Sequence, residues 1–456
     1  MLNPSDGQKV ISLEGKKKKF FIETYGCQMN FSDSEIVTSI LTDHGFDRTS
    51  EIQRADIILV NTCSIRKHAE ERVRNRLQHL GSLKRKKPGL LIGLLGCMAE
   101  RTEDSLMEVV QFLDVIACPD SYRDLPRLLT NHMNGIPSIN VLLSEKETYA
   151  DIVPVRLDSN GVTAFISIMR GCENHCAYCV VPAARGIERS REPQSILHEF
   201  RDLIKNGYHE VTLLGQNVNS YDWFGDDRQI RFPELLKMAA QVSGNMRIRF
   251  ATSHPKDLSD DLLSVIAEYP NICKSIHLPV QSGSNAVLER MNRKYTREQY
   301  LELIQTTRRI IPGCTISTDM IAGFCGETEE DHQLTLSLMR SVHFDAAFMF
   351  QYSERPQTLA AKQYKDDVPE AVKKQRLKEI IDLQQHLSLE SNKKDIGQFF
   401  EVLVEGPSKR SKSDFTGRTS QNKVVVFPKD DCEKGQYVNV LISKVTAATL
   451  MGNICR

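Results

Sequence analysis

The stretch AFISIMRGCENHCAYCVVP, residues 164–182, joins an apolar, strand-like run to a loop with three closely spaced cysteines, Cys172, Cys176 and Cys179. A closed structural zinc site takes four protein ligands, whereas an iron-sulfur cube held by three cysteines leaves one iron open to another ligand. The CxxxCxxC spacing therefore predicts a 4Fe-4S cluster with an open iron. A zinc-binding or redox loop is the alternative that these three thiols leave open.

The segments around this loop predict the fold that carries it. From residue 161 to 390, apolar runs alternate with helical stretches, and the runs are AFISIMRGC, EVTLLGQN, MRIRFATSHP, KSIHLPVQSGS, CTISTDMIAGF and DAAFMFQYS. This alternation is typical of an α/β fold with parallel strands, and its six repeats predict a (β/α)6 partial TIM barrel. Right-handed crossovers place the carboxyl ends of the strands on one rim, where we expect the cysteine loop. A charged helical connector is expected at 369–392.

The N-terminal region, residues 18–137, shows a similar alternation and predicts a parallel α/β domain. Cys27, Cys63 and Cys97 each follow an apolar run of this region. Because the carboxyl ends of neighbouring parallel strands converge on one crevice, these three thiols are expected to meet there. Each of them taken alone also fits a small buried residue. Cys118 follows another strand and is interpreted as structural.

The remaining segments are less regular. Residues 1–17 form a polar tail, and residues 138–160 resemble a linker because they lack sustained helical periodicity. Residues 391–456 contain short strand-like pieces broken by Gly, Pro, Lys and Asp, which predicts a small β-barrel. From residue 393 onward, eleven Lys and Arg stand against seven Asp and Glu, so this end is the candidate RNA-facing module. The candidate RNA contacts are Lys409, Arg410, Lys412 and Arg418.

The composition limits where the chain acts and how it attracts partners. Across 456 residues, Lys and Arg total 59 and Asp and Glu total 59, so attraction to nucleic acid must come from local patches. The N-terminus has no apolar core of a signal peptide, and the longest apolar run, residues 90–99, is too short to span a bilayer. We therefore expect a cytoplasmic protein without a membrane partner. In that compartment, the twelve cysteines are expected to be ligands, reactive thiols or core residues and not disulfide partners.

The cysteine loop, with Tyr178 directly before its third cysteine, resembles the loop of the radical SAM superfamily. The resemblance implies that S-adenosylmethionine binds the open iron and is cleaved to a 5′-deoxyadenosyl radical, with the aromatic ring against the adenine. The acidic residue that the superfamily usually has at the exit of the second strand is absent here. Asp319 fits a barrel-stabilising carboxylate equally well and is assigned no catalytic role. The candidate contacts to S-adenosylmethionine are Tyr178, Gly215, Gln216, Gln281 and Ser282.

A closer resemblance extends over nearly the whole chain. The motifs TYGCQMN, NTCSIR, GCMAE, RGCENHCAYCVVP, LLGQNVNSY, HLPVQSGS, MNRKYTRE and YSERPQT are similar to those of the MiaB-type methylthiotransferases, and the C-terminal barrel resembles their TRAM domain. This resemblance implies that Cys27, Cys63 and Cys97 hold an auxiliary 4Fe-4S cluster that carries the sulfur to be donated. It also implies that one S-adenosylmethionine methylates this sulfur and that a second supplies the radical.

The resemblance implies a substrate and partners as well. The substrate would be N6-isopentenyladenosine at position 37 of tRNA, which gains a methylthio group at C2. The partners would be the anticodon stem-loop, a reducing electron donor and a sulfur source. The alternatives are a methylthiotransferase for N6-threonylcarbamoyladenosine tRNA or for a ribosomal-protein aspartate, and a non-enzymatic, metal-stabilised RNA-binding protein. The motif TYGCQMN favours the isopentenyl substrate.

Overall fold

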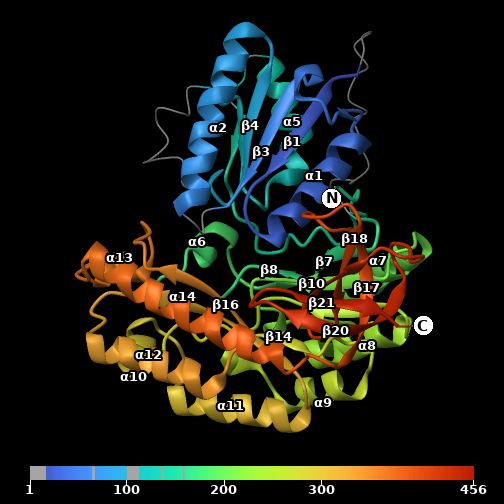
Figure 1. Cartoon of the computed structure of the whole chain (residues 1–456). Coiled ribbons are helices and arrows are strands. Elements are labelled where there is room, and N and C mark those ends of the chain that lie inside the picture. Colours follow the sequence, from blue (N-terminus) through green and yellow to red (C-terminus); the bar gives the residue numbers. More distant parts are fainter. Residues whose placement is uncertain are drawn as a thin grey trace. The chain divides into compact units, whose positions relative to one another are not determined.

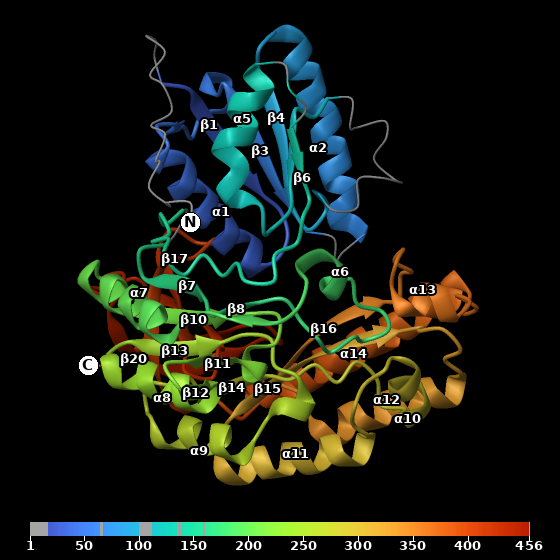
Figure 2. The same cartoon turned by 180° about the vertical axis from the view of Figure 1, so that it is seen from behind.

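The computed structural model describes residues 17–63, 67–99, 112–134, 136, 138–157 and 160–455. The chain divides into two compact units, residues 1–157 and 158–456, which are drawn in Figures 1 and 2. Within the described ranges, the structure contains no helix with the length and apolar character needed to cross a membrane.

The first unit is built on a parallel sheet with the strand order β2-β1-β3-β4-β5-β6. Strands β3 and β4 are completely buried, because helices cover both faces of the sheet. Helices α1 and α5 pack on one face, and α2 packs on the other (Figures 1 and 2). The strands are β1 (Lys19–Thr24), β2 (Asp47–Arg48), β3 (Ile57–Thr62), β4 (Leu91–Gly96), β5 (Val115–Ala117) and β6 (Ser138–Asn140). The helices are α1 (Gln28–Asp43), α2 (Lys67–Lys86) and α5 (Leu125–Met133).

The segment predicted as a linker belongs to the first unit as far as Leu157. Its first residues form β6, which pairs in parallel with β5. Farther along, the buried Tyr149 donates from its hydroxyl to Pro119 O at 2.9 Å, and its ring stacks on Tyr122. Arg156 donates to the Glu35 carboxylate of α1 at 2.8 Å. These contacts leave no periodic signal in the sequence, because they join irregular backbone through single side chains.

The second unit contains the six predicted strands of a partial barrel. They form two parallel sheets, ordered β13-β10-β7 and β14-β15-β16, and a parallel bridge between Ile248 and Ile272 continues the pairing beyond β13. The strands are β7 (Thr163–Ser167), β10 (Glu210–Leu214), β13 (Arg247–Phe250), β14 (Ser275–His277), β15 (Thr315–Ala322) and β16 (Ala346–Gln351). The outer helices are α7 (Pro193–Lys205), α8 (Phe232–Val242), α9 (Asp260–Glu268), α11 (Arg297–Ile310), α12 (Glu329–Val342) and α14 (Glu370–Lys393).

Shorter elements decorate the rim of this partial barrel. They are β8 (Met169–Arg170), β9 (Arg189–Ser190), α6 (Val181–Arg185), the hairpin β11 (Asp222–Gly225) and β12 (Arg228–Arg231), α10 (Asn285–Arg290) and α13 (Leu359–Gln363). The two faces of the barrel strands differ in chemistry. Ile166, Val211 and Ile248 belong to the apolar core beneath the helices. The alternate residues therefore line the inner face, which is largely polar.

The predicted C-terminal β-barrel is closed, with the strand order β17-β18-β19-β21-β20. Its strands are β17 (Phe399–Pro407), β18 (Asp414–Thr419), β19 (Val424–Pro428), β20 (Tyr437–Val445) and β21 (Leu450–Ile454). Among the large side chains of its core are Val402, Phe415 and Phe427.

The turn between β18 and β19 docks on the amino ends of the partial-barrel strands. Arg247 donates to Arg418 O at 2.8 Å, and Arg249 donates to Thr419 O at 2.7 Å. The Thr315 hydroxyl donates to Gln421 O at 2.7 Å. The sequence predicts separate domains at 161–390 and 391–456, and these contacts explain why the two form one compact unit. The small barrel therefore closes the partial barrel at the end opposite the cysteine rim.

Candidate active site

The CxxxCxxC loop leaves the carboxyl end of β7 through β8 and enters α6. Gly171 has a left-handed φ of +78°, and a Cβ added to it would lie 1.8 Å from Ile187 O, so only glycine fits. The next residue, Cys172, donates its backbone N–H to Gly186 O at 3.1 Å. The loop is thus held against the segment before β9 by a backbone hydrogen bond at its first cysteine.

Three consecutive residues after α10 hold the middle of this loop. Met291 O accepts a hydrogen bond from the N–H of Ala177 at 2.9 Å. The Asn292 amide donates to His175 O at 2.8 Å, and the Arg293 guanidinium donates to Cys176 Sγ at 3.2 Å. These residues lie in the MNRKYTRE motif, to which the sequence analysis assigned no structural role. A motif of polar residues beside a short helix carries no sign of a partner more than a hundred residues away.

Burial governs the protonation of the loop thiols. It raises the pKa of Cys172 to about 11 and that of Cys179 to about 12, and the neighbouring Cys176 adds to both shifts. Thiolates in such a place need strong positive partners. Three sulfur donors in one loop, with an arginine on one of them, match the donor chemistry of an iron-sulfur cluster. The described residues contain no His, Cys, Asp or Glu trio arranged to hold a single metal ion.

The residues predicted to contact S-adenosylmethionine lie on the same rim, in different surroundings. Tyr178 is partly buried and packs on a small apolar cluster that includes Phe324. Gly215 follows β10 directly, and a Cβ there would lie 2.5 Å from Met169 Cγ. In the part of the chain that the structure describes, Gln216 Oε1 is buried and accepts no hydrogen bond. It is thus an acceptor without a partner at a strand exit.

Gln281 and Ser282 are held within the loop after β14. Gln281 has a left-handed φ of +74°, donates its N–H to Asp319 O at 2.9 Å and accepts from the N–H of Ile321 at 3.0 Å. The Ser282 hydroxyl is buried, lies 3.3 Å from Thr335 Oγ1 and accepts from the N–H of Ser284 at 3.2 Å. The hydroxyl of Ser282 is therefore engaged in loop contacts.

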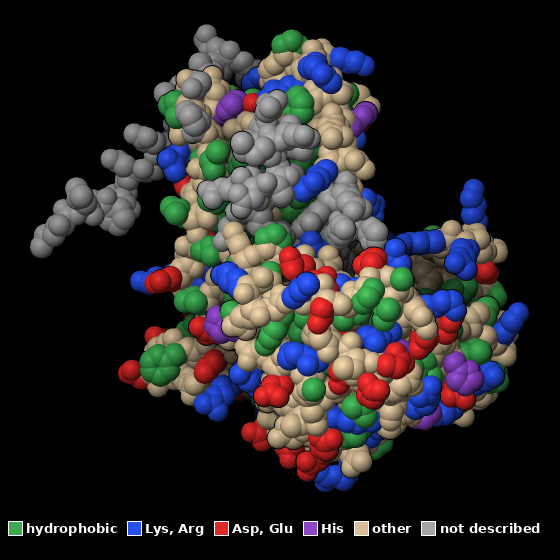
Figure 3. Space-filling view, turned by 90° about the vertical axis from the view of Figure 1, so that its left-hand side faces the viewer, with side chains coloured by type: hydrophobic (Ala, Val, Ile, Leu, Met, Phe, Trp, Pro, Cys, Tyr) green, Lys and Arg blue, Asp and Glu red, His purple; other side chains and the backbone are tan. Residues whose placement is uncertain are grey.

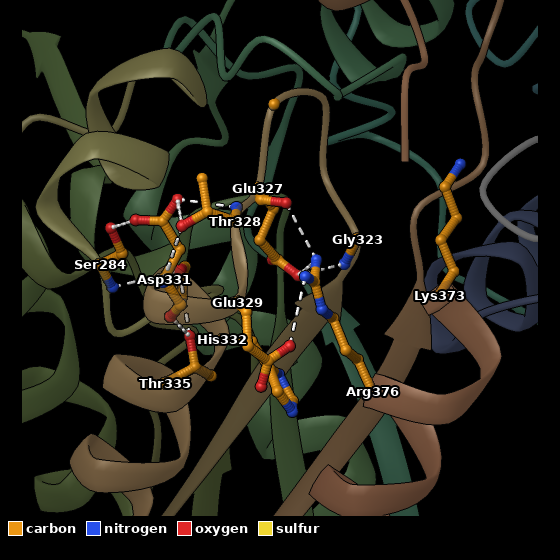
Figure 4. Close-up of polar contacts among 12 residues, drawn as sticks. Ser284, Gly323, Glu327, Thr328, Glu329, Asp331, His332, Thr335, Lys373 and Arg376 are labelled. Atoms are coloured by element: carbon orange, nitrogen blue, oxygen red, sulfur yellow. Dashed lines mark hydrogen bonds and ion pairs between the residues drawn. The ribbon is translucent and has the colours of Figure 1, made fainter. Parts of the chain in front are cut away.

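A polar network fastens the loops after β14 and β15 to the outer helices (Figure 4). The buried Glu327 carboxylate accepts from the Gly323 N–H at 2.8 Å and from Arg376 of α14 at 3.0 Å. Asp331, in the first turn of α12, forms a capping box with Thr328 and accepts from the Ser284 hydroxyl. These contacts fix the loops of the rim to the helices that surround the partial barrel. The members of this network lie far apart in the chain, so no sequence pattern links them.

The inner face of the partial barrel carries a second polar group below the rim. In the register of β14, β15 and β16, His277 pairs with Ser317 and Asp319 pairs with Phe348, so all four side chains share one face. His277 Nδ1 lies 3.0 Å from Ser317 Oγ, and its Nε2 lies 3.5 Å from Asp319 Oδ1. The ring of Phe348 is 54% exposed and meets the imidazole edge-on. An exposed aromatic ring beside hydrogen-bonding groups offers contacts to a flat heterocycle.

In the first unit, Cys27, Cys63 and Cys97 lie at the carboxyl ends of β1, β3 and β4, which are neighbours in the sheet. A Cβ added to Gly26 would lie 2.3 Å from Cys63 Cβ and 3.3 Å from its Sγ, so the backbone directly before Cys27 packs closely against Cys63. Cys97 donates its N–H to Thr62 O, directly before Cys63, at 3.0 Å. The three cysteines therefore follow neighbouring parallel strands at one edge of the sheet.

Side chains from α1 and the sheet support this edge. The Cys27 thiol donates to Asn30 Oδ1 at 3.2 Å, while the Asn30 amide donates to Tyr25 O at 3.2 Å. Cys118 follows β5, the next strand of the sheet, and its thiol donates to Leu142 O at 3.2 Å. That bond gives Cys118 a role in holding the segment after β6.

The four predicted RNA contacts of the small barrel occupy two places. Lys409, Arg410 and Lys412 are exposed between β17 and β18. Arg418 lies at the other end of β18, forms an ion pair with Glu405 at 3.2 Å and donates to Asn422 Oδ1 at 3.1 Å. Over the larger unit, the face in Figure 3 shows Lys and Arg interspersed with Asp and Glu. Local loops, and not the whole surface, are thus the candidates for binding an anionic partner.

Comparison with known families agrees with this architecture. Residues 166–339 match the Radical SAM superfamily, residues 19–118 match Uncharacterized protein family UPF0004, and residues 393–455 match the TRAM domain. Among solved structures, the radical S-adenosylmethionine methyltransferase TsrM from Kitasatospora setae, with cobalamin and a [4Fe-4S] cluster bound, has a TM-score of 0.57 at 13% identity. The match covers 76% of this chain and 77% of that chain. At that identity the likeness shows the shared fold.

Sequence relatives are much closer. A tRNA-2-methylthio-N(6)-dimethylallyladenosine synthase from Amoebophilus asiaticus is 57% identical over 450 residues, covering 96% of this chain and 93% of the relative. A synthase of the same name from Parabacteroides distasonis is 54% identical and covers 99% of both chains. S-adenosylmethionine and 4Fe-4S clusters are the cofactors that this relationship implies. The chain therefore belongs to the tRNA-2-methylthio-N(6)-dimethylallyladenosine synthase family, a branch of the radical SAM enzymes.

Proposed function

We propose that this protein adds a methylthio group to C2 of N6-isopentenyladenosine at position 37 of tRNA. The observation that carries the proposal is the presence of two separate three-cysteine sites in a chain 57% identical to a synthase of that name. The C2–H bond of an adenine is unactivated, so ordinary acid-base groups do not remove its hydrogen at neutral pH. A radical generated from S-adenosylmethionine supplies the missing reactivity.

In this proposal, Cys172, Cys176 and Cys179 hold one 4Fe-4S cluster at the rim of the partial barrel. When bound there, the cluster supplies the electron and the open coordination position for S-adenosylmethionine. Tyr178 lies against the adenine of S-adenosylmethionine. The unpaired Oε1 of Gln216, beside the close turn at Gly215, accepts a hydrogen bond from the amino group of this cofactor. Gln281 borders the ribose. Ser282 acts indirectly, because its hydroxyl already contacts Thr335 and Ser284.

Cys27, Cys63 and Cys97 hold the auxiliary 4Fe-4S cluster, the source of the transferred sulfur. The support is the order of the strands, since the three cysteines end three adjacent parallel strands. Gly26 supports it further, because any side chain there would displace Cys63. Cys118 stays outside this set because its thiol is bonded to Leu142 O.

The inner face of the partial barrel receives the base. Position 37 lies in a loop, where a base leaves its stack more easily than in a duplex. Phe348 packs on the extruded adenine, and His277, held between Ser317 and Asp319, hydrogen-bonds its edge. Lys409, Arg410 and Lys412 contact phosphates, and Arg418 makes a separate contact at the other end of β18. The tRNA substrate places the reaction in the cytoplasm, with an external reductant and a sulfur donor.

Anaerobic reconstitution followed by tRNA assays tests this proposal. Protein with both sites filled should bind about eight irons per chain, because each cube contains four. Given S-adenosylmethionine and a reductant, it should convert isopentenylated tRNA to the methylthio form, as detected by nucleoside mass spectrometry. Methylthiolation of threonylcarbamoylated tRNA or of a ribosomal protein, but not of isopentenylated tRNA, would overturn the substrate. RNA binding without cleavage of S-adenosylmethionine would support the non-enzymatic alternative.

A further inference from the structure

Arg293 is a buried cation whose contacts converge on the middle cysteine of the barrel loop. Its Nη1 donates to Cys176 Sγ at 3.2 Å, and its Nη2 donates to Pro279 O at 2.7 Å. Its Nε donates to the Tyr295 hydroxyl at 2.9 Å, and its guanidinium lies 5.1 Å from the centre of that ring. The side chain is therefore held in one orientation by three different acceptors.

The partners of Arg293 are unusual for a buried guanidinium. Within the described ranges, Arg293 forms no ion pair with Asp or Glu, and the ionisable groups that favour its charge most are Tyr295, Tyr178 and Cys176. A buried charge without a counter-charge is strongly unfavourable. The negative partner that the site provides is the sulfur of Cys176, once this cysteine is a thiolate ligand. The folded chain thus keeps a positive charge ready for an anionic group.

The neighbouring imidazole does not share this charge. The ring of His254 packs edge-on against Tyr295, with the ring centres 5.7 Å apart. Burial and the nearby Arg293 lower the pKa of His254 to about 2, so this histidine is neutral at physiological pH. Arginine stays protonated under all physiological conditions. The positive charge on the Cys176 side of the loop is therefore permanent and does not titrate.

We propose that Arg293 is a positioning residue that neutralises the Cys176 ligand and makes the barrel cluster easier to reduce. The inference rests on the proposed function, because it assumes a cluster on Cys172, Cys176 and Cys179. A fixed positive charge stabilises the state that has gained an electron, and so it raises the reduction potential. One electron passes from an external reductant to the cluster, while the bonds and protons of Arg293 stay unchanged. The same contact orients Cys176 for the metal.

The test measures the reduction potential of the barrel cluster alone. Full-length protein is reconstituted with iron and sulfide after Cys27, Cys63 and Cys97 have all been changed to Ala. Any iron that it binds then belongs to the cluster on the barrel loop. Potentiometric titration followed by EPR spectroscopy then measures the reduction potential of three variants in this background. Arg293→Gln keeps a hydrogen-bond donor but removes the charge, and Arg293→Lys keeps the charge. Arg290→Gln is the control. Arg290 is the last residue of α10, three positions before Arg293, but it donates to Gly326 O and pairs with Asp331.

We expect Arg293→Gln to shift the reduction equilibrium at least tenfold toward the oxidised form, about 59 mV for a one-electron couple. Arg293→Lys should shift it less, and Arg290→Gln should leave it unchanged. Loss of iron from the Gln variant but not from the Lys variant would also support the need for the charge. Equal potentials in all four proteins, or equal iron loss in the Gln and Lys variants, would overturn the inference. Absence of iron from the unsubstituted background would instead refute the proposed cluster.

Discussion

The two three-cysteine sites are built in opposite ways. In the second unit, Cys172, Cys176 and Cys179 lie within one loop, and the fold adds residues 291–293 from another segment to hold it. In the first unit, Cys27, Cys63 and Cys97 are far apart in sequence, and a parallel sheet brings them to one edge. The arrangement of the cysteines in the second unit follows from their local spacing in the sequence. The arrangement in the first unit exists only after the strands have paired, so it depends on the stability of the whole sheet.

Replacing one ligand at each site gives the largest expected effects. Cys176→Ala should abolish 5′-deoxyadenosine formation, because the open-iron cluster loses a ligand. Cys63→Ala should leave some cleavage of S-adenosylmethionine while eliminating methylthiolation of tRNA. Chromatography of 5′-deoxyadenosine measures the cleavage of S-adenosylmethionine, and mass spectrometry of the tRNA measures methylthiolation. Equal loss of both products in both variants would contradict the division of labour between the sites.

Substituting the glycine beside each site should remove one cluster selectively. Both Gly171→Ala and Gly26→Ala place a Cβ at a positive φ and in contact with neighbouring atoms, Ile187 O for the former and Cys63 Cβ for the latter. A non-glycine residue at such a positive φ destabilises the folded state by about 1–3 kcal/mol, apart from any steric overlap. Iron analysis should find about four of the eight irons in each variant.

The matched control for these glycine variants is Gly207→Ala. Gly207 has a φ of +79° but no atom within 4 Å of an added Cβ, so the substitution adds strain without a clash. Its iron content should equal that of the unsubstituted protein. If Gly207→Ala lost as much iron as the others, backbone strain would account for the result and close packing at the cysteines would not.

Removing the asparagine that supports each site should weaken metal retention by a smaller factor. Asn292→Ala removes the bond to His175 O, and Asn30→Ala removes the partner of the Cys27 thiol. Losses of groups that orient metal ligands typically reduce metal affinity by about 10–100-fold. Competition with an iron chelator measures the effect. Asn206→Ala, which removes an exposed bond to Asp202 O, should change nothing.

The basic residues of the small barrel should show the smallest effects. Replacing Lys409, Arg410 and Lys412 with Ser should weaken tRNA binding and reduce the salt dependence of log K by about one per lost phosphate contact. Arg418→Ser should change the slope less, because Arg418 is already paired with Glu405. Filter binding across a salt series gives the slopes. A larger change for Arg418→Ser would place the RNA contact at the other end of β18.

The parts of the fold that could be predicted from sequence are those whose signal is local or periodic. The partial barrel, the parallel sheet of the first unit and the closed C-terminal barrel each follow from the period of their apolar residues, and the structure contains all three. The placement of Cys27, Cys63 and Cys97 also followed, because each one directly ends an apolar run. Residues 138–157 carry no such signal, since single contacts such as those of Tyr149 and Arg156 tie them to the first unit.

By itself, the sequence determined which cysteines are candidate sulfur donors, how they are spaced, and which strands precede them. Only the tertiary structure decided what surrounds those donors. The contact of Arg293 with Cys176, the bond of Cys118 to Leu142 O and the docking of the 418–421 turn on Arg247 and Arg249 are examples. The physical reason is that spacing and periodicity act over a few residues, whereas a buried charge or an orphan donor is satisfied by whichever segment the fold brings within hydrogen-bonding distance.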